Sequence, residues 1–305
     1  MIILILRYYI RRNFLLFMHR IRLYSISLFT IFILTSLNPK IEWISLLDKN
    51  LSNWEMYLSF SHKNNFKGEH PKDELGNFLK PIGYNKNIKN VFSVAIQDNQ
   101  PMLRVSGEIY GCIFTKKEYE KYHLRLQVKF GKKKWVPRLN EDMDSGILYN
   151  SLGPCGIDYW KSWMLSQELQ IIEHSIGDYW CIGSSQINIK SKKNNQSFMY
   201  DSLSNKDSFG YKTINGNFCK ASNHSENEIE EWNTVELICF GDKSIHIVNG
   251  QVVMSLSDSR YMEGNKVLPL IKGKIQIQSE AAEVFYKNIE IKFINNIPEQ
   301  YSHLF

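Results

Sequence analysis

The chain has 305 residues and a formal net charge of +6 at pH 7. Five arginines and no acidic residue lie before residue 40, so the remaining residues carry a net charge of about +1. This composition lacks the clustered excess of lysine and arginine that a nucleic-acid surface needs, and no nucleic-acid partner is expected. Aromatic residues make up 13% of the chain, which indicates a globular protein and not a low-complexity one.

Residues 1–39 have the layout of a targeting segment. An uncharged stretch from Leu23 to Leu37 follows Arg20 and Arg22, and it is shorter than the ~20 apolar residues that span a bilayer. This layout predicts a signal peptide, with an uncleaved N-terminal anchor as the alternative and Met18 as a candidate true start. We therefore expect an exported protein, periplasmic or extracellular, with no membrane span beyond the leader.

Five cysteines occur, none of them in a C-x-x-C pair, at positions Cys112, Cys155, Cys181, Cys219 and Cys239. The wide spacing argues against a zinc site. An odd number in an exported protein leaves at least one thiol free, and a Cys155–Cys181 disulfide is one option. Cys239 lies in an apolar strand pattern and is expected to be a small buried residue.

One domain is predicted over residues 40–305, and its first half contains several short strands. Residues 61–90 are rich in Asn, Lys and Gly and predict a long loop. The clearest alternation runs from Tyr122 to Phe130, where apolar and polar side chains face opposite ways. Taken in chain order, the strands are expected at residues 102–105, 113–115, 122–130, 147–149 and 166–173.

The second half continues this pattern after a polar segment. Residues 191–228 have few aliphatic side chains and predict an inserted surface excursion. Strands then follow in 232–253 and 272–293, and Asn249-Gly250 is a strong hairpin signal because both residues tolerate positive φ. Residues from Asn295 onward are expected to form a frayed tail. The whole predicts an all-β, jelly-roll-like sandwich of two antiparallel sheets with few short helices.

Polar side chains interrupt the apolar strand at 166–173. Glu168 and Gln170 share one face of this strand, whereas Leu169 and Ile171 share the other. Glu173 falls on the second face unless a β-bulge intervenes. With a bulge, the three polar residues form an E-x-Q-x-x-E row on a ligand-facing surface. The alternative is a pair of solvated strand glutamates.

Six segments, taken in order, resemble a bacterial family of exported sandwich domains that is labelled 3-keto-disaccharide hydrolase. The fold that this resemblance implies is concanavalin-like and close to the family 16 glycoside hydrolases. The matching segments are LLDKNLSNWEMY (46–57), FTKKEYEKYHLRLQVKF (114–130), DSGILYN (144–150), SQELQIIEH (166–174), WNTVELICFGDKSIHIVNG (232–250) and IQIQSEAAEVFYKNIEIK (275–292).

The resemblance implies chemistry on an oxidised sugar. Family 16 hydrolases carry an E-x-D-x-x-E row, and Gln170 in place of its Asp disfavours ordinary retaining hydrolysis. A ketone at C3 of a sugar acidifies the C2 proton, so a base can remove it and the group at C1 can leave, followed by hydration. In this scheme Glu168 or Glu173 is the base, and His174 or His246 is a proton donor, an acid or a metal ligand.

Further residues are expected to bind the substrate. Gln278 and Glu280 follow Gln276 at period two and should line one strand face beside the cleft, together with Gln170. Tyr149 and Trp180 are the best candidates for aromatic platforms under a sugar ring.

Some of these residues have a second interpretation. His246 could equally be an exposed strand histidine. Asp144, before Ser145-Gly146, is more readily a turn former than a ligand. The expected partner is a carbohydrate, and the alternative function is a non-catalytic carbohydrate-binding module of the same fold. No cofactor is assigned; a divalent metal is compatible with the Glu and His residues, but no spacing is diagnostic of one.

Overall fold

The computed structural model describes residues 11–20, 42–63, 66, 69–97, 99–195, 197–222 and 224–305. The chain divides into two units, Met1–Glu42 and Trp43–Phe305. In the first unit, residues 11–20 are helical and exposed, whereas the apolar stretch of the predicted signal segment, residues 23–37, lies outside the described residues. None of the helices in the described ranges has the length and apolar character needed to cross a membrane.

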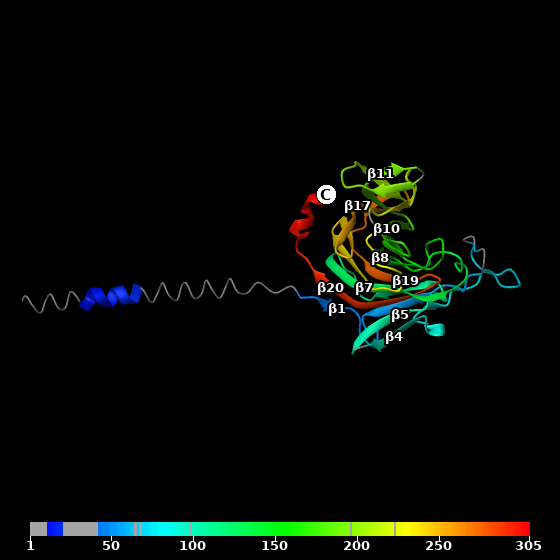
Figure 1. The fold of residues 1–305 in the computed structure, drawn as a ribbon, viewed down its shortest axis with the longest axis horizontal. Coiled ribbons are helices and arrows are strands. Elements are labelled where there is room, and N and C mark those ends of the chain that lie inside the picture. Colours follow the sequence, from blue (N-terminus) through cyan, green and yellow to red (C-terminus); the bar gives the residue numbers. More distant parts are fainter. Residues whose placement is uncertain are drawn as a thin grey trace, which may run out of the picture. The chain divides into compact units, whose positions relative to one another are not determined.

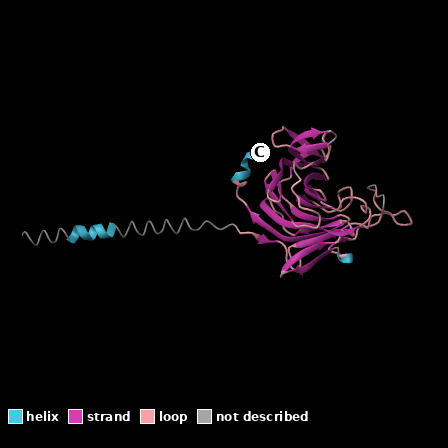
Figure 2. Ribbon diagram, viewed as in Figure 1, coloured by secondary structure: helices cyan, strands magenta, loops and turns pink. Residues whose placement is uncertain are grey.

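The second unit is built almost entirely of strands (Figure 2) and forms two antiparallel sheets, as the sequence predicted. The larger sheet runs in the order β12 (Ser197–Tyr200), β11 (Ser185–Asn194), β17 (Gln251–Glu263), β16 (Lys243–Val248), β15 (Asn233–Phe240), β7 (Lys121–Lys134), β20 (Ala282–Phe293), β5 (Gln100–Val105) and β4 (Phe92–Gln97), with β1 (Ile44–Ser45), β13 (Lys206–Gly210) and β18 (Lys266–Pro269) attached.

The smaller sheet lies along the inner side of this curved sheet, as the positions of β8, β10 and β19 show (Figure 1). Its order is β14 (Phe218–Cys219), β10 (Ser175–Ile182), β9 (Leu165–Ile172), β8 (Asp144–Leu152), β19 (Lys274–Ser279), β6 (Gly111–Thr115), β2 (Trp54–Leu58) and β3 (Gly83–Tyr84). Two short 3₁₀ helices, η1 (Ile88–Asn90) and η2 (Glu299–Leu304), complete the unit.

The core between the sheets follows from the period-two pattern. Leu124 and Leu126 of β7 point inward together with Leu237 of β15, and Leu169 and Ile171 of β9 meet them from the smaller sheet. A strand presents alternate side chains to opposite faces, so Glu168 and Gln170 of β9 lie on the outer face of the smaller sheet. This face carries the candidate site.

Two segments expected to be irregular are ordered. The predicted excursion at residues 191–228 contains the end of β11 and the short strands β12, β13 and β14. The expected tail after Asn295 instead forms η2, where Leu304 is buried. Its cluster includes Ile238, Ile245 and Ile247 of the larger sheet, so the helix covers isoleucines that would otherwise face water.

All five cysteines are free thiols in the structure. The Cys155–Cys181 disulfide, one option from the sequence, is therefore not formed. Cys155 instead lies with its Sγ 3.7 Å from Sγ of Cys112. Cys239 is fully buried, as predicted.

Truncation of Leu304 should show whether η2 belongs to the folded domain. Leu304→Ala removes a buried side chain over the isoleucine cluster, and we expect the free energy of unfolding to fall by about 2 kcal/mol. Urea denaturation measures this change. His303→Ala, at an exposed neighbour, is the matched control and should change stability by less than ~0.5 kcal/mol. Equal effects of the two substitutions would mean that η2 does not pack on the sheet in solution.

Candidate functional site

A cavity of about 1400 Å³ lies over the outer face of the smaller sheet. Residues that are paired across neighbouring strands form rows across the cavity floor, from β19 through β8 to β9. Glu280 pairs with Asp144 in the first row. In the second row, Gly146 pairs with Gln170. The pairing of Gln276 with Leu148, and of Leu148 with Glu168, defines the third row.

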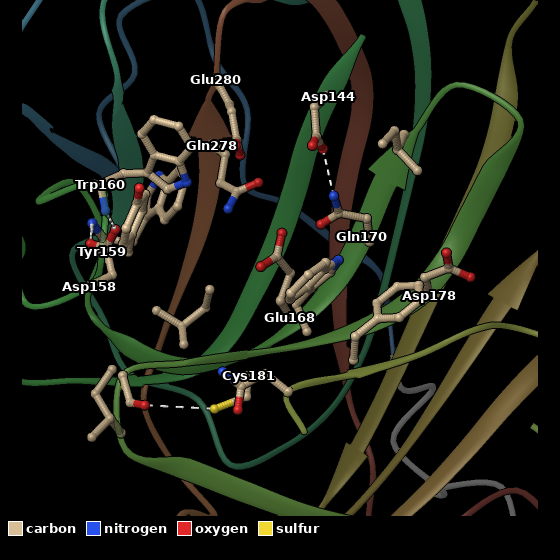
Figure 3. Close-up of a pocket in the computed structure, with 18 of the residues that line it drawn as sticks. Asp144, Asp158, Tyr159, Trp160, Glu168, Gln170, Asp178, Cys181, Gln278 and Glu280 are labelled. Carbon is tan, nitrogen blue, oxygen red and sulfur yellow. Dashed lines mark hydrogen bonds between the residues drawn. The ribbon is translucent and has the colours of Figure 1, made fainter. Parts of the chain in front are cut away.

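One arginine neutralises the first part of this floor. Arg138 Nη1 lies 2.6 Å from Oδ2 of Asp144 and 3.0 Å from Oε1 of Glu280. The other Asp144 oxygen accepts a hydrogen bond of 2.6 Å from the Gln170 side-chain amide, which Figure 3 shows as a dashed line. The cluster is nearly closed to solvent, with Asp144 3% and Glu280 5% exposed. Two carboxyl groups thus share one cation in a buried place.

Glu168 has no such cation. Its side chain projects into the cavity between Gln170 and Gln278 (Figure 3). Oε1 of Glu168 and Oε1 of Gln278 are both buried without a hydrogen-bond partner. A buried polar atom in this condition is costly unless a ligand or a proton satisfies it. A ligand group or a proton is therefore expected to bind between these two oxygens.

Gly146 makes this arrangement possible. A Cβ at position 146 would overlap Oε1 of Glu168 and Oε1 of Gln278. Because Gly146 carries no side chain, these two residues from neighbouring strands can approach each other above its backbone.

Burial also decides the protonation of the three carboxyl groups. Burial raises the pKa of Glu168 well above its usual range, and the nearby Glu280 and Asp144 raise it further, although the Gln278 side-chain amide opposes this shift. Burial raises the pKa of Asp144 to about 7, although the Arg138 charge opposes this shift. The pKa of Glu280 is also raised, first by burial and then by Asp144. Burial thus favours the protonated form of Glu168, whereas Asp144, with a pKa of about 7, is partly ionised at neutral pH.

The other predicted acid and its neighbour lie at the rim of the cavity. Strand β9 ends at Ile172, and its pairing with β8 from Ile172 to Gln167 has no bulge. Glu173 is therefore in the turn after the strand, where its Oε2 accepts a 2.9 Å hydrogen bond from Met143 N. The expected E-x-Q-x-x-E row on one strand face does not form. His174 follows in the same turn, exposed and lining the cavity.

His246 and Tyr149 lie together, but not in the cavity. Nδ1 of His246 donates to the Gly177 carbonyl (2.9 Å), which leaves Nε2 to accept from the Tyr149 hydroxyl at 3.1 Å. Both side chains are fully buried between the sheets. Burial lowers the pKa of His246 to about 4, so the ring is neutral at physiological pH. The expectation of an exposed histidine is wrong, and Tyr149 offers no face to a ligand.

Trp180 remains on the cavity wall, 39% exposed. Its partner in β9 is Glu168, and its partner in β14 is Phe218. Gln278 and Glu280 line the cavity as predicted. Gln276 is fully buried, and its amide hydrogen-bonds to the Ser151 hydroxyl.

Sequence reasoning missed the role of Arg138 and misjudged Asp144. Asp144 begins β8 and is not a turn former. Arg138 lies in the connection between β7 and β8, and no local pattern reveals its two carboxylate partners. Asp158 also borders the cavity, but its carboxylate accepts hydrogen bonds from the backbone of Trp160, Ser162 and Trp163 and so orders that loop.

Among the described residues, no group of three or more His, Cys, Asp or Glu side chains is arranged to hold a metal ion. The metal that the sequence allowed stays a prediction.

Comparison with protein families identifies the chain. Residues 42–292 match the family model described as the 3-keto-alpha-glucoside-1,2-lyase-like domain. The chain belongs to this family. The match covers nearly all of the second unit, including every strand of the cavity floor, and it confirms the family resemblance stated from the sequence. Among curated proteins, none matches this sequence.

Several solved structures are distantly similar. A protein from Parabacteroides distasonis, described as a candidate glycosyl hydrolase, is 17% identical with a TM-score of 0.43; the match covers 83% of this chain and 100% of that one. The β-glucanase of Bacillus licheniformis is 9% identical with a TM-score of 0.38, over 83% and 98% of the two chains. A carbohydrate-binding module of Bacillus subtilis is 9% identical with a TM-score of 0.37, over 66% and 91%. Similarities this distant carry no argument about activity.

A substitution of Gly146 should test the packing above it. Gly146→Ala places a methyl group against two buried oxygens, and we expect the free energy of unfolding to fall by about 1–3 kcal/mol. A double-mutant cycle with Gln278→Ala provides the control, since the smaller side chain gives the methyl group room. Denaturant unfolding should then show a smaller cost of Gly146→Ala in that background. Strict additivity of the two changes would contradict the contact.

The protonation of Glu168 can be tested through stability. In the unfolded chain Glu168 loses its proton above its ordinary pKa, whereas the native state retains it, so the native state binds more protons and rising pH favours unfolding. The amide introduced by Glu168→Gln cannot titrate. The stability of this variant relative to the parent should therefore increase by about 1.4 kcal/mol for each pH unit between pH 5 and 7. Denaturation at both pH values measures this; a constant difference would mean that Glu168 is ionised when folded.

Proposed function

We propose that this protein cleaves 3-keto-glycosides by removing the C2 proton and eliminating the group at C1. Its membership of the 3-keto-alpha-glucoside-1,2-lyase-like family supports this reaction. The observation that carries the proposal is the buried, cation-free Glu168, whose Oε1 has no partner, on a cavity floor shared with an arginine-paired Asp144. Elimination needs a base and an acid at the same time, and unequal environments of neighbouring carboxyl groups provide such a pair.

In the first step Asp144 accepts the C2 proton. The C2–H bonding electrons delocalise into the C3 carbonyl and form an enolate, whose oxygen needs a hydrogen-bond donor. The side-chain amide of Gln278 is suited to this role, because it lines the cavity next to Glu168 and its Nε2–H groups can donate. Arg138 holds Asp144 partly ionised and so keeps a base available near neutral pH.

In the second step the ketone reforms, a C1=C2 double bond forms and the C1–O bond breaks. Glu168 donates its proton to the departing oxygen. Water then adds at C1 and the proton from Asp144 returns to C2, so the net result is hydrolysis of the glycosidic bond. Glu168 regains its proton from the added water, and both carboxyl groups return to their starting states.

His174 and Glu173 are left outside the two chemical steps. His174 is exposed at the rim, and Glu173 binds Met143 N and the Lys134 ammonium group, 3.5 Å away. Both lie where they can contact the outer part of a bound substrate. We propose further that the protein acts outside the cytoplasm, on the strength of the basic and apolar leader.

The test follows C2 deuterium exchange and glycoside cleavage by NMR, with a 3-keto-glucoside and its unoxidised parent in D₂O. We expect exchange and release from the keto compound alone. Asp144→Asn should abolish both. Glu168→Gln should retain exchange and slow release by roughly 10²-fold or more, the size of a lost general acid. Glu118→Gln, at a glutamate with 44% side-chain exposure away from the cavity, is the matched control and should leave both unchanged.

Other results would overturn the proposal in recognisable ways. Cleavage of the unoxidised parent would indicate ordinary glycoside hydrolysis. Binding of the keto compound without exchange would indicate a carbohydrate-binding module. Loss of exchange in Glu168→Gln with normal exchange in Asp144→Asn would reverse the two roles.

A further inference from the structure

The cavity has two chemically different parts. Its polar floor comes from β8, β9 and β19, and its apolar wall comes from β10, β14, the end of β8 and the loop that follows β8. The exposed apolar side chains of this wall include Trp180 at 39%, Ile157 at 41% and Leu152 at 37%. Scattered surface hydrophobics need no explanation, but several that line one cavity indicate a ligand surface.

The wall begins directly beside the proposed acid. Glu168 of β9 pairs with Trp180 of β10, and Trp180 pairs with Phe218 of β14. Side chains at paired positions share one face of a sheet, so these three form a row that leads from the carboxyl group into two aromatic rings. The ring centroids of Trp180 and Phe218 are 4.8 Å apart at 42°. Their contact fixes the indole in position while leaving part of it open to the cavity.

The loop after β8 supplies the opposite side of this wall. A Cβ on Gly183 would overlap Cδ1 of Ile157, which means that Ile157 packs tightly on the turn between β10 and β11. Ile182 lies next to that turn and also lines the cavity. Trp180, Ile182 and Ile157 thus form an apolar channel. Asp178 and Lys220 also line the cavity near it, but the two Asp178 oxygens already accept hydrogen bonds from the Ser175 hydroxyl and Ala221 N.

We infer that this channel binds the leaving group of the substrate, and that the preferred leaving group is a planar apolar alcohol and not a second sugar. The inference rests on the proposed function, which places the departing oxygen at Glu168. The group attached to that oxygen must then extend along the row toward Trp180 and Phe218. A sugar there would bring several hydroxyl groups against apolar side chains that cannot bond them, whereas an aromatic ring would bury both faces favourably.

Trp180 is on this basis a specificity residue, and benzyl and methyl glucosides test it. Both leaving alcohols have nearly the same acidity, so only the fit of the leaving group differs. With the 3-keto derivatives we expect kcat/KM of the parent protein to be roughly ten-fold higher for benzyl than for methyl. Trp180→Leu should remove most of this preference, chiefly by raising KM for the benzyl compound, whereas Trp180→Phe should restore part of it. Trp232→Leu, outside the cavity, should leave the benzyl-to-methyl ratio of kcat/KM unchanged.

Binding of the unoxidised glucosides, measured by calorimetry, separates this inference from the proposed function. Tighter binding of benzyl than methyl glucoside that Trp180→Leu abolishes would support the channel even if no cleavage occurred. Equal binding and equal kcat/KM of the two glucosides would overturn it. A 3-keto-disaccharide that outperforms the benzyl compound, with the loss in Trp180→Leu falling on the disaccharide, would overturn it in favour of a sugar-binding subsite.

Discussion

The burial of three carboxyl groups with one arginine is the constraint on which the candidate site depends. Placing an ionised carboxylate in a low-dielectric site is costly unless a cation and hydrogen bonds compensate it. Arg138 compensates Asp144 and, in part, Glu280. It does not reach Glu168, which keeps its proton instead. The difference between the carboxyl groups is therefore a consequence of the position of a single guanidinium group.

The sheet provides the geometry in which this difference becomes useful. Glu168 and Gln278 come from strands that are separated by β8, so the side chain at the middle position decides whether they can meet. Gly146 leaves that position empty. The site thus needs a residue that contributes nothing chemically, because any larger one would separate the groups that do the chemistry.

Much of the arrangement of the candidate site could be predicted from period-two alternation, and little of it from sequence motifs. Alternation placed Glu168 with Gln170 on one face of their strand, and Gln278 with Glu280 on one face of theirs, since that inference requires only that a strand is regular. Glu173 could not be placed in this way, because its position depends on where β9 ends. Arg138 lies outside any strand, so its approach to Asp144 is set by tertiary packing alone.

His246 illustrates a different limit. The sequence shows that it faces away from Ile245 and Ile247, and the structure agrees. Alternation does not say which of two faces is buried, however, and the apolar flanks suggest that the isoleucines point to the core. They lie instead on the outer face under η2, so the histidine points between the sheets. Since this choice depends on the last residues of the chain, no local pattern could have revealed it.

The apolar wall and the proton on Glu168 are physically coupled. Trp180 is paired with Glu168 across the sheet, and burial is the largest cause of the raised Glu168 pKa. A leaving group that covered Trp180 would keep water away from the mouth of this buried carboxyl group and so preserve its raised pKa. Occupation of the channel would then hold the acid in its protonated form until the leaving oxygen developed charge. Binding and proton transfer would thus reinforce each other, because a ligand that excludes water beside Glu168 also stabilises the protonation state that the reaction requires.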